Sequence, residues 1–213
     1  MIFRNRTSAG ELLAEKLADV LTSREEKIVL ALPRGGLPVA APVAERLGAE
    51  LDIVVARKIG APGREEFGVG AIAEDGPPVF DEANLRWAGV TAEDMAATVT
   101  AERAELARRV RRYRGDRPTP PVTGRAVVLI DDGLATGVTA HAALRWLRLQ
   151  QPALLVLAVP VCAPQARDLL VPDADTVVCL CAPDDFMAVG RWYEDFGQLD
   201  DEDVDAVLAT ARR

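Results

Sequence analysis

Histidine and cysteine are scarce in this chain of 213 residues. The single histidine, His141, excludes metal sites built from several histidines, and it leaves any serine–histidine–aspartate triad dependent on one residue. The three cysteines, Cys162, Cys179 and Cys181, form an odd set within apolar runs, and Cys-x-Cys without further ligands is not a zinc site. We therefore expect core thiols in a reducing cytoplasm, and neither disulfides nor a zinc centre.

Long apolar runs and excess positive charge are also missing. No stretch of about 18 consecutive apolar residues occurs, as a membrane-spanning helix would need, and the first residues lack the apolar segment of a signal peptide. The net charge is −8 at pH 7, which argues against a nucleic-acid partner because attraction to phosphates needs a positively charged face. We expect a cytoplasmic protein with neither a membrane nor a nucleic-acid partner.

What the sequence does contain is a regular alternation of strands and helices. The length suits one domain over residues 1–213 that buries a full core without disulfides. Apolar runs predict strands at 27–32, 51–56, 126–130, 154–161 and 176–180, and helical spacing predicts helices at 8–21, 39–47, 91–114, 139–149 and 163–170. This order predicts an α/β fold with a mostly parallel central sheet flanked by helices.

Residues 57–72 break the alternation. They contain four glycines, at positions 60, 63, 68 and 70, and little apolar periodicity. A glycine-rich stretch of this length inside a compact domain is usually functional or mobile, so we predict a long flexible loop. Asp75-Gly76-Pro77 predicts a hairpin turn after it, so that 57–80 forms a flexible loop and hairpin.

The helix predicted over 91–114 is rich in arginine. Six arginines lie in its second half: Arg103, Arg108, Arg109, Arg111, Arg112 and Arg114. One interpretation is a binding patch for nucleic acid or a phosphate. The interpretation we favour is a solvated face whose positive charge also suits the C-terminal end of the helix dipole.

The clearest chemical signal is a pair of acids, Asp131 and Asp132, directly after the strand 126–130. Open α/β sheets bind ligands at the C-terminal ends of their strands. The pair is followed by small and hydroxyl-bearing residues that lead into a helix: Gly133, Ala135, Thr136, Gly137, Val138 and Thr139. Small residues let backbone N–H groups approach an anion, and a helix N-terminus adds further donors. Carboxylates can bind the hydroxyl groups of a sugar, and the loop beside them can bind a phosphate. Together these two features predict a site for a sugar phosphate.

Three segments together resemble one enzyme family. Residues 127–139 resemble the 5-phosphoribosyl 1-diphosphate (PRPP) binding motif of type I phosphoribosyltransferases, two acids followed by Thr-Gly-x-Thr. Leu32–Gly36 resembles the family's pyrophosphate loop, whose backbone often includes a non-proline cis peptide. Arg57-Lys58 resembles the basic pair that opens its flexible catalytic loop. The whole chain is similar to bacterial phosphoribosyltransferase-like proteins.

The resemblance implies an activity: Mg²⁺-dependent transfer of phosphoribose between PRPP and a nitrogenous base, with release of pyrophosphate. Asp131 and Asp132 would bind the ribose hydroxyls, and Gly133 with the Ala135–Thr139 loop would hold the 5-phosphate. Catalysis would rest on charges that stabilise an oxocarbenium-like cation and a leaving dianion.

Basic residues of the other two segments complete the implied PRPP site. Arg34 and Gly35, with Lys58 and Arg57, would contact pyrophosphate together with Mg²⁺. Lys58 would share the catalytic role with the acid pair. The alternative function is a PRPP- or nucleotide-sensing regulatory protein that keeps the loop but performs no transfer.

Residues 181–199 resemble the base-binding hood of hypoxanthine-guanine phosphoribosyltransferases. By that resemblance Phe186 and Trp192 would bind the nucleobase-like acceptor, and Asp195 would contact the metal. The Phe-to-Gly and Gly-to-Asp intervals are each longer by one residue than in that group, and its base-reading lysine has no clear counterpart, so the acceptor base stays open. The alternative for this stretch is an aromatic cluster that seals the core or forms a homodimer contact.

Overall fold

A five-stranded parallel sheet forms the centre of the protein, whose computed structural model describes residues 1–21 and 26–211. The strand order is β2-β1-β6-β7-β8, and every neighbouring pair is parallel. The strands are β1 Lys27–Ala31, β2 Glu50–Ile53, β6 Ala126–Ile130, β7 Leu154–Val161 and β8 Thr176–Cys181. The predicted α/β fold with a mostly parallel sheet is confirmed.

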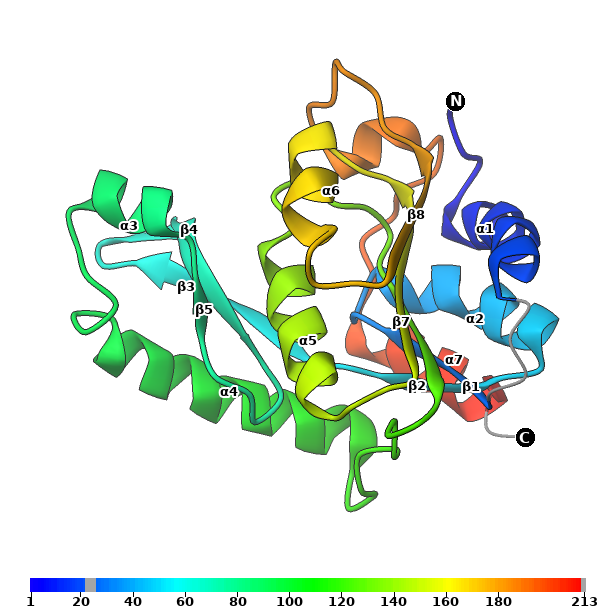
Figure 1. Ribbon diagram of the computed structural model, residues 1–213, viewed down its shortest axis with the longest axis horizontal. Coiled ribbons are helices and arrows are strands. Elements are labelled where there is room, and N and C mark those ends of the chain that lie inside the picture. Colours follow the sequence, from blue (N-terminus) through cyan, green and yellow to red (C-terminus); the bar gives the residue numbers. More distant parts are fainter. Residues whose placement is uncertain (22–25, 212–213) are drawn as a thin grey trace.

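Helices cover both faces of this sheet (Figure 1). One face carries α1 Arg6–Val20, α2 Gly36–Leu47 and α7 Asp201–Ala211, and the other carries α5 Val138–Leu149 and α6 Pro164–Leu170. Alternate strand residues serve the two cores: Val29 and Val128 pack toward α1 and α2, whereas Ile28 and Val127 pack toward α5. Within the described residues, none of the helices combines the length and apolar character that crossing a membrane requires.

A second sheet corrects the prediction of a long loop over 57–72. Residues there form two antiparallel strands, β3 Ala56–Ala61 and β4 Arg64–Ala73, and β5 Val79–Phe80 adds to β4. The glycines allow close strand approach: a Cβ on Gly60 would lie 2.2 Å from the Glu65 carbonyl oxygen, and the pairing register shifts beside Gly60. The predicted turn at 75–77 does join β4 to β5.

This second sheet belongs to an arm that projects from the central sheet (Figure 1). The arm also contains α3 Glu82–Ala88 and α4 Ala96–Arg114. Helix α4 packs along β3 and β4, and Ile59, Val69 and Ile72 are buried against the same core that α1 and α2 cover. Apolar side chains inside the glycine-rich segment therefore hold it as a sheet.

The segment 181–199 lies against the beginning of the chain. The Phe3 N–H donates to the Trp192 carbonyl oxygen at 2.8 Å, and Phe3 and Tyr193 pack in one small core cluster. The short helix η1 Val189–Trp192 lies within this segment. All three cysteines are free, with Cys162 buried as expected of a core thiol.

Parallel strands bring the chemistry-bearing loops together. Ala31 of β1 is the register partner of Ile130 of β6. The residues that follow these two strands, 32–36 and 131–137, therefore begin at the same edge of the sheet.

Candidate functional site

The acid pair lies at the C-terminal end of β6, and both side chains are half-buried. The Asp132 N–H donates to Asp131 Oδ1 at 2.9 Å. Burial, together with the charge of neighbouring Asp132, raises the pKa of Asp131 well above its ordinary value. Burial also raises the pKa of Asp132, against the lowering effect of Arg6. Two acids are thus held close together where water access is restricted.

Arg6, which the sequence analysis did not single out, binds Asp132 of this pair. Its Nε donates to Asp132 Oδ2 at 2.8 Å and its Nη1 to the Gly197 carbonyl oxygen at 2.9 Å. The guanidinium carbon lies 3.8 Å from the centroid of the Phe196 ring, a cation–π contact. No motif surrounds Arg6 in the sequence, so only the folded chain identifies it.

The hood segment supports the acid pair from another direction. The Tyr193 hydroxyl donates to the Asp132 carbonyl oxygen at 2.6 Å. A Cβ on Gly133 would lie 2.7 Å from Val189 Cγ1, so the glycine is needed for η1 to pack this closely. Tyr193 is a second residue that the sequence analysis missed, although it lies inside the predicted hood.

The loop after the acids exposes free backbone donors. Leu134 anchors it to the end of β7: its N–H donates to the Val161 carbonyl oxygen at 3.0 Å, and its carbonyl oxygen accepts from the Ala163 N–H at 2.8 Å. Within the part of the chain that the structure describes, the N–H groups of residues 135–139 have no backbone partner. Gly137 has a φ of +74° and begins the turn into α5. This loop can cradle an anion at the helix N-terminus.

The loop 33–36 lies directly against the acids. A Cβ on Gly35 would lie 2.1 Å from Asp132 Oδ2, and one on Gly36 would lie 2.6 Å from the Ile130 carbonyl oxygen. The peptide bond between Pro33 and Arg34 is cis, the conformation that the resemblance implies for this loop. Only residues without a Cβ permit this close approach.

A cavity of about 410 Å³ opens between these elements. It is lined by Arg6, Arg34, Gly35, Asp132 and residues 196–199. The Arg34 side chain is half-exposed, with its Nη1 3.9 Å from Asp201 Oδ1. The cavity thus combines two guanidinium groups with one of the two acids, as binding of a charged, hydroxyl-bearing ligand would need.

Arg57 and Lys58 are placed elsewhere. Both lie on β3. Arg57 pairs with Glu102 of α4 at 2.7 Å, while Lys58 Nζ donates to the Glu66 carbonyl oxygen at 2.9 Å and lies 3.6 Å from its carboxylate. Among the described residues, neither basic side chain has a hydrogen bond or ion pair with the acid pair.

The predicted base- and metal-binding residues of the hood lie in different surroundings. Phe186 is half-buried between two apolar clusters. Trp192 Nε1 is buried without a hydrogen-bond partner among the described residues. Asp195 is exposed, and its Oδ1 accepts from the Gly197 N–H at 3.2 Å. Within residues 1–21 and 26–211, no three acidic, cysteine or histidine side chains group as metal ligands.

Comparison with known proteins identifies the family of this chain. The family model of the phosphoribosyl transferase domain matches residues 4–195. The chain therefore belongs to the phosphoribosyl transferase family.

Individual relatives extend the match over the whole chain. It is 42% identical over 212 residues to "Putative phosphoribosyl transferase Rv0571c" of Mycobacterium tuberculosis, covering 100% of this chain and 47% of that protein. The chain thus spans about half the length of this curated relative. The crystal structure of TT1426 from Thermus thermophilus has a TM-score of 0.83 and 45% identity, with 99% of each chain covered.

A more distant structure shares the fold alone. A hypothetical protein from Neisseria gonorrhoeae, crystallised with bound ppGpp, has a TM-score of 0.53 and 15% identity. The match covers 100% of this chain and 99% of that one.

Proposed function

We propose that this chain is a Mg²⁺-dependent phosphoribosyltransferase that transfers phosphoribose between PRPP and a nitrogenous base, with release of pyrophosphate. One arrangement carries the proposal: Gly35 lies directly against Asp132, and the half-buried acids Asp131 and Asp132 lead into residues 135–139, whose N–H groups have no backbone partner among the described residues. Carboxylates accept hydrogen bonds from ribose hydroxyls, and the amide groups at the start of α5 suit the 5-phosphate.

The roles of the basic residues follow from what surrounds them. Arg34, beside Gly35 in the cavity at Asp132, would bind the pyrophosphate end of PRPP. Arg57 and Lys58 would also bind the pyrophosphate, but each must first release its present carboxylate partner, Glu102 for Arg57 and Glu66 for Lys58. Positive charge at the pyrophosphate would stabilise the leaving dianion in the transition state.

The oxygen ligands of this site fit Mg²⁺. The ion keeps several waters and is usually bound by one or two carboxylates together with substrate phosphates. Asp131 and Asp132 are the carboxylates at the sugar site, and Asp195 of the hood would be a further contact. When bound with PRPP, Mg²⁺ would neutralise charge on the departing pyrophosphate.

The acceptor would bind under the hood, with Phe186 and Trp192 against the base. The buried, unpartnered Nε1 of Trp192 supports this assignment because a buried donor without an acceptor is costly. We further propose that the chain acts in the cytoplasm as one domain and forms a homodimer.

Calorimetric titration of PRPP in the presence of Mg²⁺ tests the site. The variant carrying Asp131→Asn and Asp132→Asn is expected to lose PRPP binding, because an amide cannot replace the charged acceptor. Unchanged PRPP affinity in this variant would refute the assignment of the acid pair.

Pyrophosphate release tests the reaction itself. The unmodified chain is incubated with PRPP, Mg²⁺ and each of a panel of purine and pyrimidine bases. Release that depends on one base supports transfer and names the acceptor. PRPP binding with no release on any base would favour the alternative, a PRPP- or nucleotide-sensing regulatory protein.

A further inference from the structure

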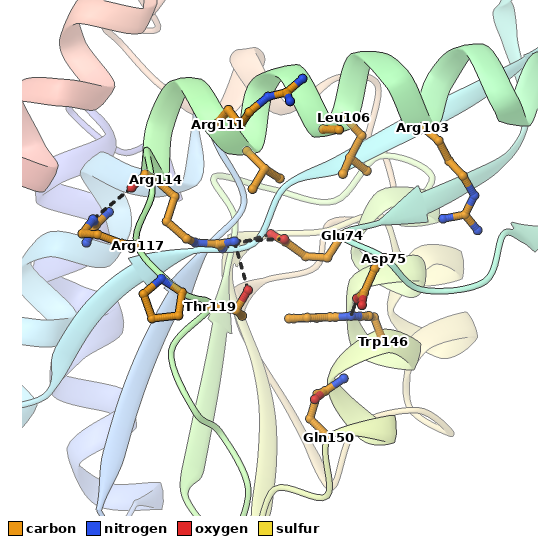
Figure 2. A pocket seen from close by; sticks show the side chains of 13 residues that line it. Glu74, Asp75, Arg103, Leu106, Arg111, Arg114, Arg117, Thr119, Trp146 and Gln150 are labelled. Carbon is orange, nitrogen blue, oxygen red and sulfur yellow. Dashed lines mark hydrogen bonds and ion pairs between the residues drawn. The ribbon is translucent and has the colours of Figure 1, made fainter.

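A second cavity, of about 650 Å³, lies between the arm and α5 (Figure 2). Its walls come from the turn after β4, from α4 and the residues that follow it, and from α5. It shares no lining residue with the cavity at the acid pair. Its volume falls within the range of small-molecule sites.

The ion pairs of α4 separate its arginines into two groups. Arg108 and Arg109 pair with Glu105, Arg112 pairs with Asp205, and Arg114 pairs with Glu74. Within the described residues, Arg103 and Arg111 have no carboxylate partner, and both line this cavity. Both arginines of α4 without a carboxylate partner therefore line the cavity, together with the paired Arg114. Arg103 also donates to the Gly76 carbonyl oxygen at 2.8 Å.

The carboxylates of the cavity wall are already satisfied. Glu74 binds Arg114 at 3.0 Å and accepts from the Val55 N–H at 2.8 Å. Asp75 accepts from Trp146 Nε1 at 2.7 Å. Four arginines line the cavity against these two acids. Arg114 is paired with Glu74 and Arg117 lies 3.8 Å from Asp52, so Arg103 and Arg111 supply the excess positive charge. In Figure 2, Arg111 and Arg103 extend from α4, and Glu74, Thr119 and Trp146 lie below this helix. The guanidinium of Arg111 is drawn turned away from them, and because Arg111 is exposed its side chain can rotate toward the cavity.

Apolar groups form much of the remaining surface. Leu106, Ala107 and Val110 extend along α4, and Pro118 and the buried Trp146 form further parts of the wall. Such a surface favours a ligand with a flat apolar body. The guanidinium groups favour a phosphate on that ligand, because their planar donors match phosphate oxygens in pairs.

We propose that this cavity is a second ligand site, separate from the acid pair, that binds a nucleoside phosphate. Arg111 and Arg103 bind its phosphate, and the apolar wall of α4 receives its base. An inorganic phosphate ion alone would leave most of the cavity unfilled, so the organic body contributes to affinity.

The three tryptophans allow this site to be observed directly. Trp146 lines the cavity, Trp192 lies in the hood and Trp87 is exposed on α3. In NMR spectra of ¹⁵N-labelled protein, the three indole N–H signals are assigned with single Trp→Phe variants. Adenosine 5′-monophosphate is then titrated into the variant carrying Asp131→Asn and Asp132→Asn, in which the acid-pair site is impaired. The expected result is a saturable shift of the Trp146 signal while the Trp87 signal stays in place.

Two arginine variants in the same background test the assignment. Arg111→Ala, which removes a side chain without a carboxylate partner in the described chain, is expected to weaken binding at Trp146 by at least about tenfold. Arg108→Ala removes the same charge from the same helix outside the cavity, and is expected to leave the affinity unchanged. Inorganic phosphate is expected to bind more weakly than the nucleotide.

Several results would overturn the proposal. They are a Trp146 signal that does not move up to about 1 mM nucleotide, a shift confined to Trp192, or equal weakening by the two arginine variants. If inorganic phosphate bound as tightly as adenosine 5′-monophosphate, the apolar wall would contribute nothing to binding. Because the acid pair is already mutated, none of these results depends on the proposed transferase reaction.

Discussion

Arg6 holds Asp132 by a hydrogen bond of 2.8 Å between Nε and Oδ2, with the two side chains only 11% and 14% exposed. The contact joins the first helix of the chain to the C-terminal end of β6, the middle strand of the central sheet. It fixes the carboxylate that the sugar would meet, and it favours the ionised form of Asp132 against the effect of burial. Asp131 has no ion-pair partner among the described residues, and burial together with the charge of Asp132 raises its pKa well above the ordinary value.

Arg6→Ala is therefore expected to move the pH dependence of PRPP binding upward. Loss of the guanidinium removes the interaction that lowers the pKa of Asp132, so this carboxyl takes up a proton at higher pH. As the pH is lowered, PRPP affinity should therefore begin to fall at a higher pH in this variant than in the unmodified protein. Calorimetry across a pH series measures this difference. Arg4→Ala, an exposed neighbour, is the control. Identical pH profiles for all three proteins would contradict the role of Arg6.

Asp131→Asn is expected to stabilise the fold by about 0.5–2 kcal/mol near neutral pH while it removes PRPP binding. The folded pKa of Asp131 is raised, so the folded protein binds this proton more tightly than the unfolded chain. Stability from this group is present below its ordinary pKa and is lost as pH rises through the folded pKa. Urea unfolding should show no gain near pH 4 and a growing gain at higher pH. A variant less stable than the parent at neutral pH would argue against a destabilising effect of the buried Asp131 carboxylate and its repulsion from Asp132.

The sequence predicted most of the central sheet because its strands are nearly continuous apolar runs. The predicted bounds 126–130 and 154–161 are those of β6 and β7. The acid pair followed from the same logic, since ligands bind where parallel strands end. Here local pattern and global fold agree.

Such sequence patterns could not predict contacts between segments that are distant in the sequence. Arg6 and Asp132 are 126 positions apart, and Tyr193 and Asp132 are 61 apart. Periodicity reports which face of an element is buried, but not which distant side chain meets it. The arm was misread for a related reason: its glycines indicated a loop, whereas in the fold Gly60 makes room for the facing strand.

Lys58→Ala is expected to reduce turnover much more than PRPP binding. Lys58 is engaged by Glu66 on the neighbouring strand, so its contact with pyrophosphate would form mainly as the leaving group departs. Steady-state rates of pyrophosphate release and calorimetric PRPP affinity separate the two effects. Equal loss of both would mean that Lys58 only anchors the ligand.

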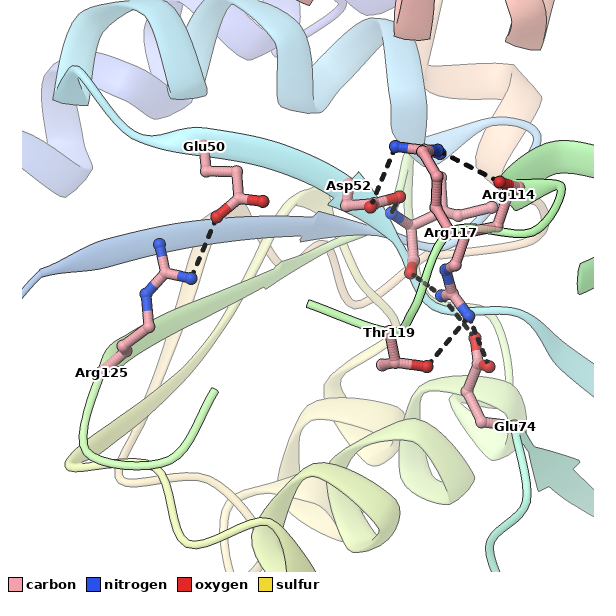
Figure 3. Close-up of polar contacts among 8 residues, drawn as sticks. Glu50, Asp52, Glu74, Arg114, Arg117, Thr119 and Arg125 are labelled. Atoms are coloured by element: carbon pink, nitrogen blue, oxygen red, sulfur yellow. Dashed lines mark hydrogen bonds and ion pairs between the residues drawn. The ribbon is translucent and has the colours of Figure 1, made fainter. Parts of the chain in front are cut away.

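Arg114→Met is expected to destabilise the protein by about 3–5 kcal/mol, because it leaves Glu74 as a buried charge without its partner. The side chains of this pair are 2% and 6% exposed, and Arg114 also donates to the Ile53 carbonyl oxygen at 2.9 Å. Figure 3 shows its guanidinium between Glu74 and Thr119, where the arm meets the central sheet.

A matched variant shows how far the loss of stability depends on the burial of the ion pair. Arg112→Met breaks the pair with Asp205, whose side chains are 41% and 45% exposed, and should cost less than about 1 kcal/mol. Adding Glu74→Gln to Arg114→Met should recover part of the loss, because the uncompensated charge is then removed. Urea unfolding of the four proteins measures all these differences. Equal losses for Arg114→Met and Arg112→Met would show that Glu74 finds another partner or a proton when Arg114 is absent.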